Sequence, residues 1–223
     1  MKIKYLILIF LAIISNSAFA KMTWVKADNV NPEQVNSAKI IFNGEINPQQ
    51  IAELISAIDE INNDYPSSKV IKLYINSFGG SMESAYIASQ AVQGSKIPIE
   101  AINAAMTASS ATLIYCSAKK RYAFQESSFL LHPAASPNTE KKWLRPNDVA
   151  LIKKDVEDGN KYFKHAYASC TKLTPHDIDE VLFSNDNARY ILAKEARKTG
   201  LSQGEVLGIT PTHVSYYITN EEE

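Results

Sequence analysis

Short apolar runs alternate with longer amphipathic segments along most of this chain. The runs at 39–43, 70–75 and 97–101 have the length and the β-branched content of buried strands. In the segments at 48–64 and 82–94, apolar residues recur every three or four positions, so they would share one face of a helix. Repeated strand and helix units predict an α/β fold with a mainly parallel sheet.

Residues that begin or stop helices flank these segments. Asn47 and Thr174 each precede a proline, the arrangement of an N-cap followed by proline at the first helical position. Gly94 and Gly200 are placed to end helices. The other expected elements are a small-residue buried helix within 106–118 that begins close to Ser109, strands at 121–124 and 129–132, a polar excursion at 133–146, and helices at 147–170, 178–183 and 193–199.

The N-terminus has the three parts of a secretory signal peptide. Lys2 and Lys4 give a basic start, residues 5–14 form an apolar run too short to span a bilayer comfortably, and Ala18-Phe19-Ala20 is a small-x-small cleavage pattern. We therefore expect residues 1–20 to be a signal peptide, removed near Ala20 to leave a mature chain in the periplasm or outside the cell. An uncleaved membrane anchor or a buried first helix are the alternatives.

The mature chain, 21–223, has the size of one compact domain. Without Lys2 and Lys4, 21 basic side chains face 24 acidic ones, and the net charge is −3. This balance gives no basic field for nucleic acid, and no motif predicts a metal or a cofactor. The two cysteines, Cys116 and Cys170, could form one disulfide in an oxidising compartment, or Cys116 could be a buried free thiol.

Three short segments could together supply acyl-transfer chemistry, which needs a nucleophile, a base and backbone donors for an oxyanion. Gly79-Gly80 lies between a strand and a helix, where amide groups could approach a substrate closely, although a plain tight turn has the same sequence. Ser109 lies at a strand-to-helix junction and could be a nucleophile or a helix cap. His132 ends an apolar strand and could be a base or a structural residue.

At these segments the sequence resembles the proteolytic subunit family of the Clp protease. Tyr74-Ile75-Asn76-Ser77-Phe78-Gly79-Gly80 is similar to the family's Tyr-Ile-Asn-Ser-Pro-Gly-Gly loop, and Ala108-Ser109-Ser110-Ala111 to its Ala-Ser-Met-Gly nucleophile turn. The stretch from Lys119 to His132 follows the family's Lys-Arg to His segment, and Ala193-Lys194-Glu195-Ala196 resembles its closing helix. The resemblance covers roughly residues 39–201.

The resemblance implies a ClpP/crotonase-like fold of repeated ββα units with a projecting helical handle, here 147–170. It also implies Ser109 as nucleophile, His132 as general base, and Gly79, Gly80 and Ser110 as oxyanion and substrate-binding residues. The family's third triad residue, an aspartate, aligns with Ala188. Asp186 is the preferred replacement, since a carboxylate orients an imidazole and stabilises its cation; Asn187 or no third residue are the alternatives.

The predicted function is a serine peptidase that hydrolyses peptides or unfolded chains through an acyl-enzyme outside the cytoplasm. We expect a homo-oligomer, and no ATPase partner because that compartment lacks ATP. Three alternatives remain: a Clp-fold scaffold without activity, a signal-peptide-peptidase type that uses a serine with Lys119 or Lys120, and an acyl-CoA enzyme of the crotonase group.

Overall fold

The computed structural model describes residues 20–27, 30–137 and 143–220. All of the predicted signal peptide except Ala20 lies outside the described residues. Within the described ranges, no helix is long and apolar enough to cross a membrane.

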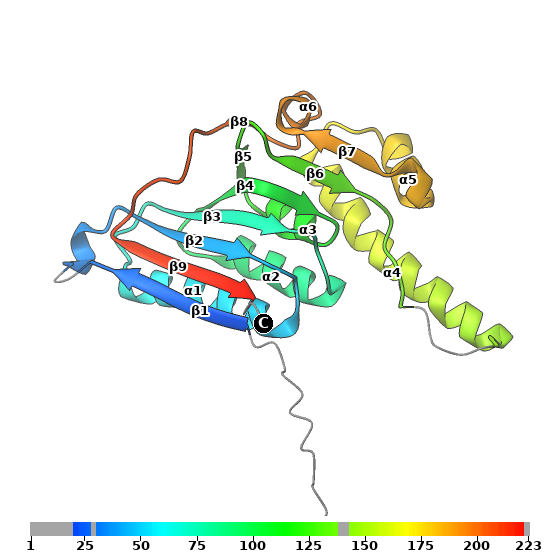
Figure 1. Cartoon of the computed structure of the whole chain (residues 1–223), viewed down its shortest axis with the longest axis horizontal. Helices are drawn as coiled ribbons and strands as arrows, with labels where there is room; N and C mark the ends of the chain where they lie inside the picture. The colour runs from blue at the N-terminus through cyan, green and yellow to red at the C-terminus, as the bar shows by residue number, and fades with distance from the viewer. Residues whose placement is uncertain (1–19, 28–29, 138–142, 221–223) are drawn as a thin grey trace, which may run out of the picture.

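In the described chain, nine strands form one sheet in the order β1-β9-β2-β3-β4-β5-β8, with β6 paired to β4 and β7 paired to β6 (Figure 1). Only the β1–β9 and β6–β7 pairs are antiparallel, so the predicted mainly parallel sheet is confirmed. The strands are β1 (Ala20–Lys26), β2 (Ser37–Asn43), β3 (Val70–Ser77), β4 (Ile99–Ala108), β5 (Lys120–Ala123), β6 (Ser128–Leu131), β7 (Arg189–Leu192), β8 (Gly204–Glu205) and β9 (Val214–Asn220).

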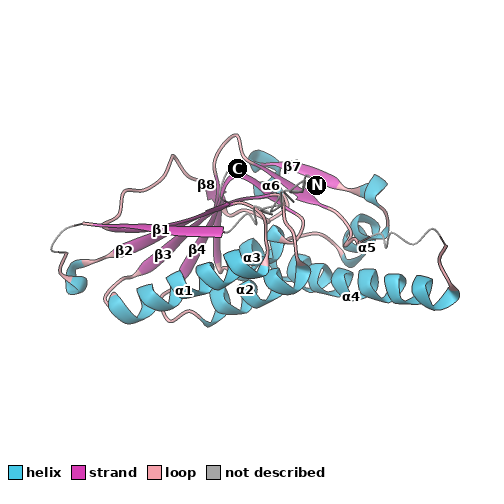
Figure 2. Cartoon of the chain, turned by 60° about the horizontal axis from the view of Figure 1, so that its bottom comes forward, coloured by secondary structure: helices cyan, strands magenta, loops and turns pink. Residues whose placement is uncertain are grey.

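Helices α1, α2 and α3 lie against one face of this sheet, and α4 continues past its edge (Figure 2). The buried residues of α1 to α3 pack with those of the central strands in one hydrophobic core. The helices are α1 (Pro48–Asp64), α2 (Met82–Gly94), α3 (Ala111–Ser117), α4 (Pro146–Cys170), α5 (Pro175–Phe183) and α6 (Ala193–Lys198), with short 3₁₀ turns η1 (Pro32–Gln34) and η2 (Asn185–Asn187).

The long helix α4 is buried along only half of its length. Its buried residues are Gly159, Phe163, Tyr167 and Cys170, which recur at steps of four and three and therefore form one stripe on its C-terminal half. No residue of 146–158 is buried, and this N-terminal half projects away from the sheet (Figures 1 and 2). The predicted projecting helix is thus confirmed.

Both predicted N-caps are also confirmed. The Asn47 side chain accepts a hydrogen bond from the Gln50 N–H at 2.9 Å, and the Thr174 hydroxyl accepts one from the Asp177 N–H at 3.1 Å. These caps satisfy amides that have no partner inside the helix.

The helix expected within 106–118 begins close to Ser109, as predicted, but residues 106–108 are not part of it. β4 extends to Ala108, and α3 begins only at Ala111. Thr107 pairs with Ser77 of β3 and with Phe129 of β6, so a strand on each side holds this segment extended in spite of its small residues. Residues 106–108 are therefore strand, and only the part after Ser109 is helix.

Candidate active site

Ser109 occupies a strained turn between β4 and α3. Its φ of 53° is the only positive φ of a non-glycine residue in the described chain. This left-handed conformation costs about 1–2 kcal/mol for a residue with a Cβ. The turn is held because the Ser109 N–H donates to the Leu130 carbonyl at 3.0 Å and its carbonyl accepts from the Thr112 N–H at 2.9 Å. A serine held in a sharp strand-to-helix turn is the geometry of an exposed nucleophile.

The Gly79-Gly80 loop lies directly against this serine. Gly79 has a φ of 101°, and a Cβ added to it would come within 2.6 Å of the Ser109 Cβ. Gly80 has a φ of 147°, and its added Cβ would collide with the Ile46 backbone. Both positions therefore require glycine, for conformation and for space. The loop is a close approach to the serine turn and not a plain tight turn.

The backbone amides near Ser109 differ in their partners. The Gly79 N–H, expected to bind an oxyanion, donates to the Ser77 hydroxyl at 3.1 Å. Within the described chain, the N–H groups of Ser110 and Gly80 make no hydrogen bond, while the Ser110 hydroxyl donates to the Gly80 carbonyl at 3.1 Å. The Ser110 side chain thus ties the serine turn to the glycine loop and leaves its own amide without a protein acceptor.

His132 follows β6, the strand next to β4. Ala108 pairs with Leu130 in the parallel register, so Ser109 and His132 leave the same edge of the sheet on neighbouring strands. A strand spacing of about 4.8 Å and a rise of about 3.3 Å per residue place their Cα atoms roughly 6 Å apart. The imidazole is half-buried, and its centroid lies 6.4 Å from that of the Phe163 ring. The register therefore places the backbones of the two predicted catalytic residues near one another, while no hydrogen bond joins the Ser109 hydroxyl to the imidazole in the described chain.

The imidazole makes its hydrogen bond with the backbone. Its Nδ1 lies 2.7 Å from the Pro133 carbonyl oxygen. Asp186 is exposed in η2, where its N–H donates to the Ser184 hydroxyl, and the Asn187 side chain donates to the Glu180 carbonyl. Among the described residues, neither of these two side chains hydrogen-bonds His132, so the role of Asp186 stays a prediction.

The two lysines of the serine–lysine alternative lie at the opposite edge of the sheet. Lys120 begins β5, pairs in register with Glu100 and forms an exposed ion pair with it at 3.2 Å. Glu100 is the second residue of β4, whereas Ser109 follows its last residue. At about 3.3 Å per residue, the nine steps from Glu100 to Ser109 span at most about 30 Å, so Lys120 lies far from Ser109 and this alternative is disfavoured.

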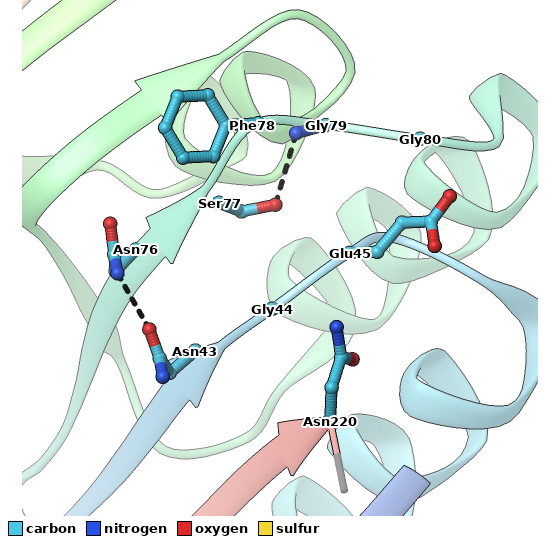
Figure 3. Close-up of a pocket in the computed structure, with 9 residues that line it drawn as sticks. All are labelled: Asn43, Gly44, Glu45, Asn76, Ser77, Phe78, Gly79, Gly80 and Asn220. Carbon is cyan, nitrogen blue, oxygen red and sulfur yellow. Dashed lines mark hydrogen bonds between the residues drawn. The ribbon is translucent and has the colours of Figure 1, made fainter. Parts of the chain in front are cut away.

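Two cavities border the glycine loop, and Gly80 lines both. The first, of about 550 Å³, is lined by the amide side chains of Asn43, Asn76 and Asn220, by Glu45, and by the loop from Ser77 to Gly80 with Phe78 at its rim (Figure 3). The second, of about 630 Å³, lies between Gly80, the residues that follow His132, and α4.

Helix α4 supplies contacts to the site that the sequence did not indicate. The Tyr167 hydroxyl lies 3.0 Å from the Thr112 hydroxyl, which itself donates to the Ser109 carbonyl at 2.6 Å. Burial raises the pKa of the Tyr167 hydroxyl, so this group stays protonated at neutral pH. The nucleophile turn is therefore fastened to α4 through two buried hydroxyl groups, neither of which stands out in a sequence without its partner.

The two cysteines are bonded to each other. The disulfide joins Cys116 of α3 to Cys170 at the end of α4, with a Cα–Cα distance of 5.4 Å. Of the two possibilities left open by the sequence, the structure contains the bond. It links the helix that begins beside Ser109 to the helix that contacts His132.

A parallel sheet that brings a glycine loop, a strained serine and a histidine to one edge defines an α/β protein of the ClpP type. The Clp protease family profile matches residues 25–206. The ATP-dependent Clp protease proteolytic subunit 2 of Treponema denticola is 29% identical over 173 residues, which cover 75% of this chain and 80% of that protein. A ClpP1 mutant from Listeria monocytogenes has the same fold, with a TM-score of 0.61, 17% identity, and 76% and 91% of the two chains covered.

The chain belongs to the Clp protease family. Its ClpP-type fold, expected from the resemblance, is confirmed. Members of this family are homo-oligomeric peptidases that act on peptide substrates. Membership therefore supports a serine-type peptidase activity.

Proposed function

We propose that this protein is an extracytoplasmic serine peptidase with Ser109 as nucleophile and His132 as general base. The observation that carries the proposal is the strained Ser109 turn, which lies against Gly79 and opens at the same sheet edge as His132. Strain at a polar residue beside a close glycine loop is typical of a functional site, because such a conformation persists only where the surroundings impose it.

In the proposed reaction, the His132 ring accepts the proton of the Ser109 hydroxyl while its oxygen attacks the carbonyl carbon of a peptide. The C–N bond breaks as His132 gives that proton to the leaving amine, and water then hydrolyses the acyl-enzyme by the same steps. The N–H groups of Ser110 and Gly79 hold the oxyanion. A charged oxyanion is a stronger acceptor than a neutral hydroxyl, so it displaces the Ser77 oxygen from the Gly79 amide.

The disulfide supports the proposed compartment, and the start of β1 is compatible with the proposed cleavage. Disulfides persist mainly in oxidising compartments, and the Cys116–Cys170 bond is of that kind. β1 begins at Ala20, so cleavage there leaves Lys21 paired with Thr219 and nearly the whole edge strand in place. We expect the secreted protein to begin at Lys21 by intact mass. A secreted chain that retains Met1 would contradict the proposed cleavage.

A homo-oligomer is proposed from the unpacked half of α4. Val149 and Leu151 on this half expose 52% and 65% of their surface, and Leu144, just before the helix, exposes 46%. Apolar side chains gathered on an exposed surface mark interaction sites. Native mass spectrometry at micromolar concentration should show an oligomer, and Val149→Glu with Leu151→Glu should shift it toward monomer. A wild-type monomer would contradict this part of the proposal.

No ATP-dependent partner is proposed, because the proposed compartment lacks ATP.

A fluorophosphonate probe tests the function directly, since it labels only an activated serine. The mature protein should be labelled, and Ser109→Ala should lose both the label and at least about 10³-fold of its peptide hydrolysis. His132→Ala should slow labelling to a similar extent. Ser117→Ala is the matched control, because Ser117 lies at the end of α3, the helix that follows the serine turn. This variant should behave as wild type. Folded protein without labelling would instead support the scaffold alternative.

A further inference from the structure

The atom that faces Nδ1 of His132 is a backbone oxygen. The Pro133 carbonyl lies 2.7 Å from this nitrogen and can only accept a hydrogen bond. Nδ1 must therefore carry the ring proton when the imidazole is neutral. Nε2 then has its lone pair free for the proton of Ser109. A carbonyl thus provides the tautomer that an aspartate provides in a catalytic triad.

The same peptide group is anchored at its other end. The Pro133 carbonyl and the Ala134 N–H belong to one planar unit. The Ala134 N–H donates to Oδ1 of Asn160 at 2.8 Å. Because the unit is planar, the hydrogen bond to Asn160 fixes the direction in which the carbonyl points. Asn160 therefore acts on the imidazole through one intervening peptide plane.

A second hydrogen bond fixes the Asn160 side chain, and a glycine next to it lets α4 approach the segment that follows His132. Its Nδ2 donates to the Leu182 carbonyl at the end of α5 at 3.1 Å. The preceding residue, Gly159, is buried, and a Cβ there would lie 2.6 Å from the Ala134 Cβ. A mid-helix glycine costs about 1 kcal/mol relative to alanine. Close approach of α4 to the segment after His132 explains why glycine stands at this position.

We propose that His132 is oriented by the Pro133 carbonyl and that Asn160 is the positioning residue that holds this carbonyl, in place of a third catalytic carboxylate. The proposal rests on the proposed function of Ser109 and His132. It also explains how the site operates with alanine at position 188. A carbonyl carries only a partial negative charge, so it fixes the ring without stabilising its cation as strongly as a carboxylate does.

Kinetics of matched variants test the assignment. Asn160→Ala should lower kcat at least tenfold with KM within twofold, because Asn160 touches the histidine segment and not the substrate. Asn160→Asp keeps an acceptor for the Ala134 N–H and should recover most of the lost kcat. Asn185→Ala, which removes an exposed side-chain amide from η2, is the matched comparison and should stay within twofold of wild type. A tenfold loss in Asp186→Ala with an unaffected Asn160→Ala would overturn the proposal.

The tautomer can be observed without any activity. The chain has four histidines, so ¹⁵N-histidine labelling with His132→Gln as the assignment control isolates the signal of His132. The neutral ring should be protonated at Nδ1 in wild type. In the Asn160→Ala variant this preference should weaken, provided that the variant is shown to be folded by a cooperative thermal transition. Protonation at Nε2 in wild type would overturn the proposal even if the variant fails to fold. Fluorophosphonate labelling of Ser109 reports separately on the proposed function.

Discussion

Among single residues, the site depends on positions where an added Cβ would collide with a neighbouring atom. Gly79 lies against Ser109, and the serine itself has a left-handed φ that is held by hydrogen bonds to Leu130 and Thr112. Such positions carry a conformational cost that the fold must offset, and they recur at functional sites for that reason.

We predict that Gly79→Ala abolishes hydrolysis and destabilises the fold. The new Cβ would meet the Ser109 Cβ at 2.6 Å, and alanine is strained at a φ of 101°. We expect a loss of at least about 100-fold in kcat/KM, the effect of removing an oxyanion donor, and of about 1–3 kcal/mol in the free energy of unfolding. Peptide hydrolysis and urea unfolding measure the two effects.

Gly94→Ala is the control for this substitution. A Cβ at Gly94 meets nothing within 4 Å, and the residue ends α2 with an ordinary negative φ. Its activity should equal that of wild type. Equal losses in both variants would mean that Gly79 has only a structural role.

Among the helices and strands, the sequence predicts correctly those features whose determinants are local. The caps at Asn47 and Thr174 depend on residues three positions away, and their helices began where expected. The end of β4 could not be read locally, because strands from distant parts of the chain hold 106–108 extended. β9 was missed for the same reason: it returns from the C-terminus to pair with β1 and β2.

The site divides in the same way. Ser109 and His132 stood out through motifs whose order along the chain is specific, and the register of β4 and β6 brings them together. Asn160 was not found, because its partner Ala134 is 26 positions away and a polar residue on a long helix resembles any solvated one. The residues that position catalytic groups act through tertiary contacts, so a pattern along the chain does not reveal them.

The Asp177 carboxylate in the first turn of α5 makes the stability of this helix depend on pH. Hydrogen bonds from the Thr174 side chain and backbone, followed by one from Arg189, lower the pKa of Asp177 from its ordinary 3.8 to about 2. This carboxylate is ionised in the folded protein over a wider pH range than in the unfolded chain. Its stabilising contribution is therefore complete above about pH 5 and is lost as pH falls through 4 toward 2.

We predict that Asp177→Asn lowers the melting temperature at pH 6 and that its difference from wild type shrinks between pH 4 and 2. Thermal unfolding across this range measures the effect. Asp155→Asn, which removes one exposed carboxylate from α4, is the matched control for the change in net charge. A pH-independent difference would show that Asp177 stabilises α5 without the hydrogen bonds to its ionised form.

At the scale of the whole molecule, α4 joins the site to the rest of the fold. Its buried stripe contacts the His132 segment at Gly159 and the serine turn through Tyr167, and it ends at the disulfide to α3. The other half of the same helix projects away from the sheet and exposes apolar side chains. If a partner subunit binds the projecting half, as proposed, it binds the same helix that contacts the two proposed catalytic residues.

A disulfide joins the end of α4 to α3. Cys116 and Cys170 are 54 positions apart, and closing a loop of that length in the unfolded chain is worth about 4 kcal/mol on the chain-entropy account. Reduction, or substitution of both cysteines by serine, should therefore lower the free energy of unfolding by about 4 kcal/mol and the melting temperature by roughly 10 °C. Urea and thermal unfolding with and without dithiothreitol measure these shifts. The double-serine variant, whose stability reductant cannot change, is the control.

Because the bond holds α4 against α3, hydrolysis by the reduced protein should also decline before global unfolding. Equal stability with and without reductant, in protein shown by mass to contain the bond, would contradict a stabilising role for the disulfide.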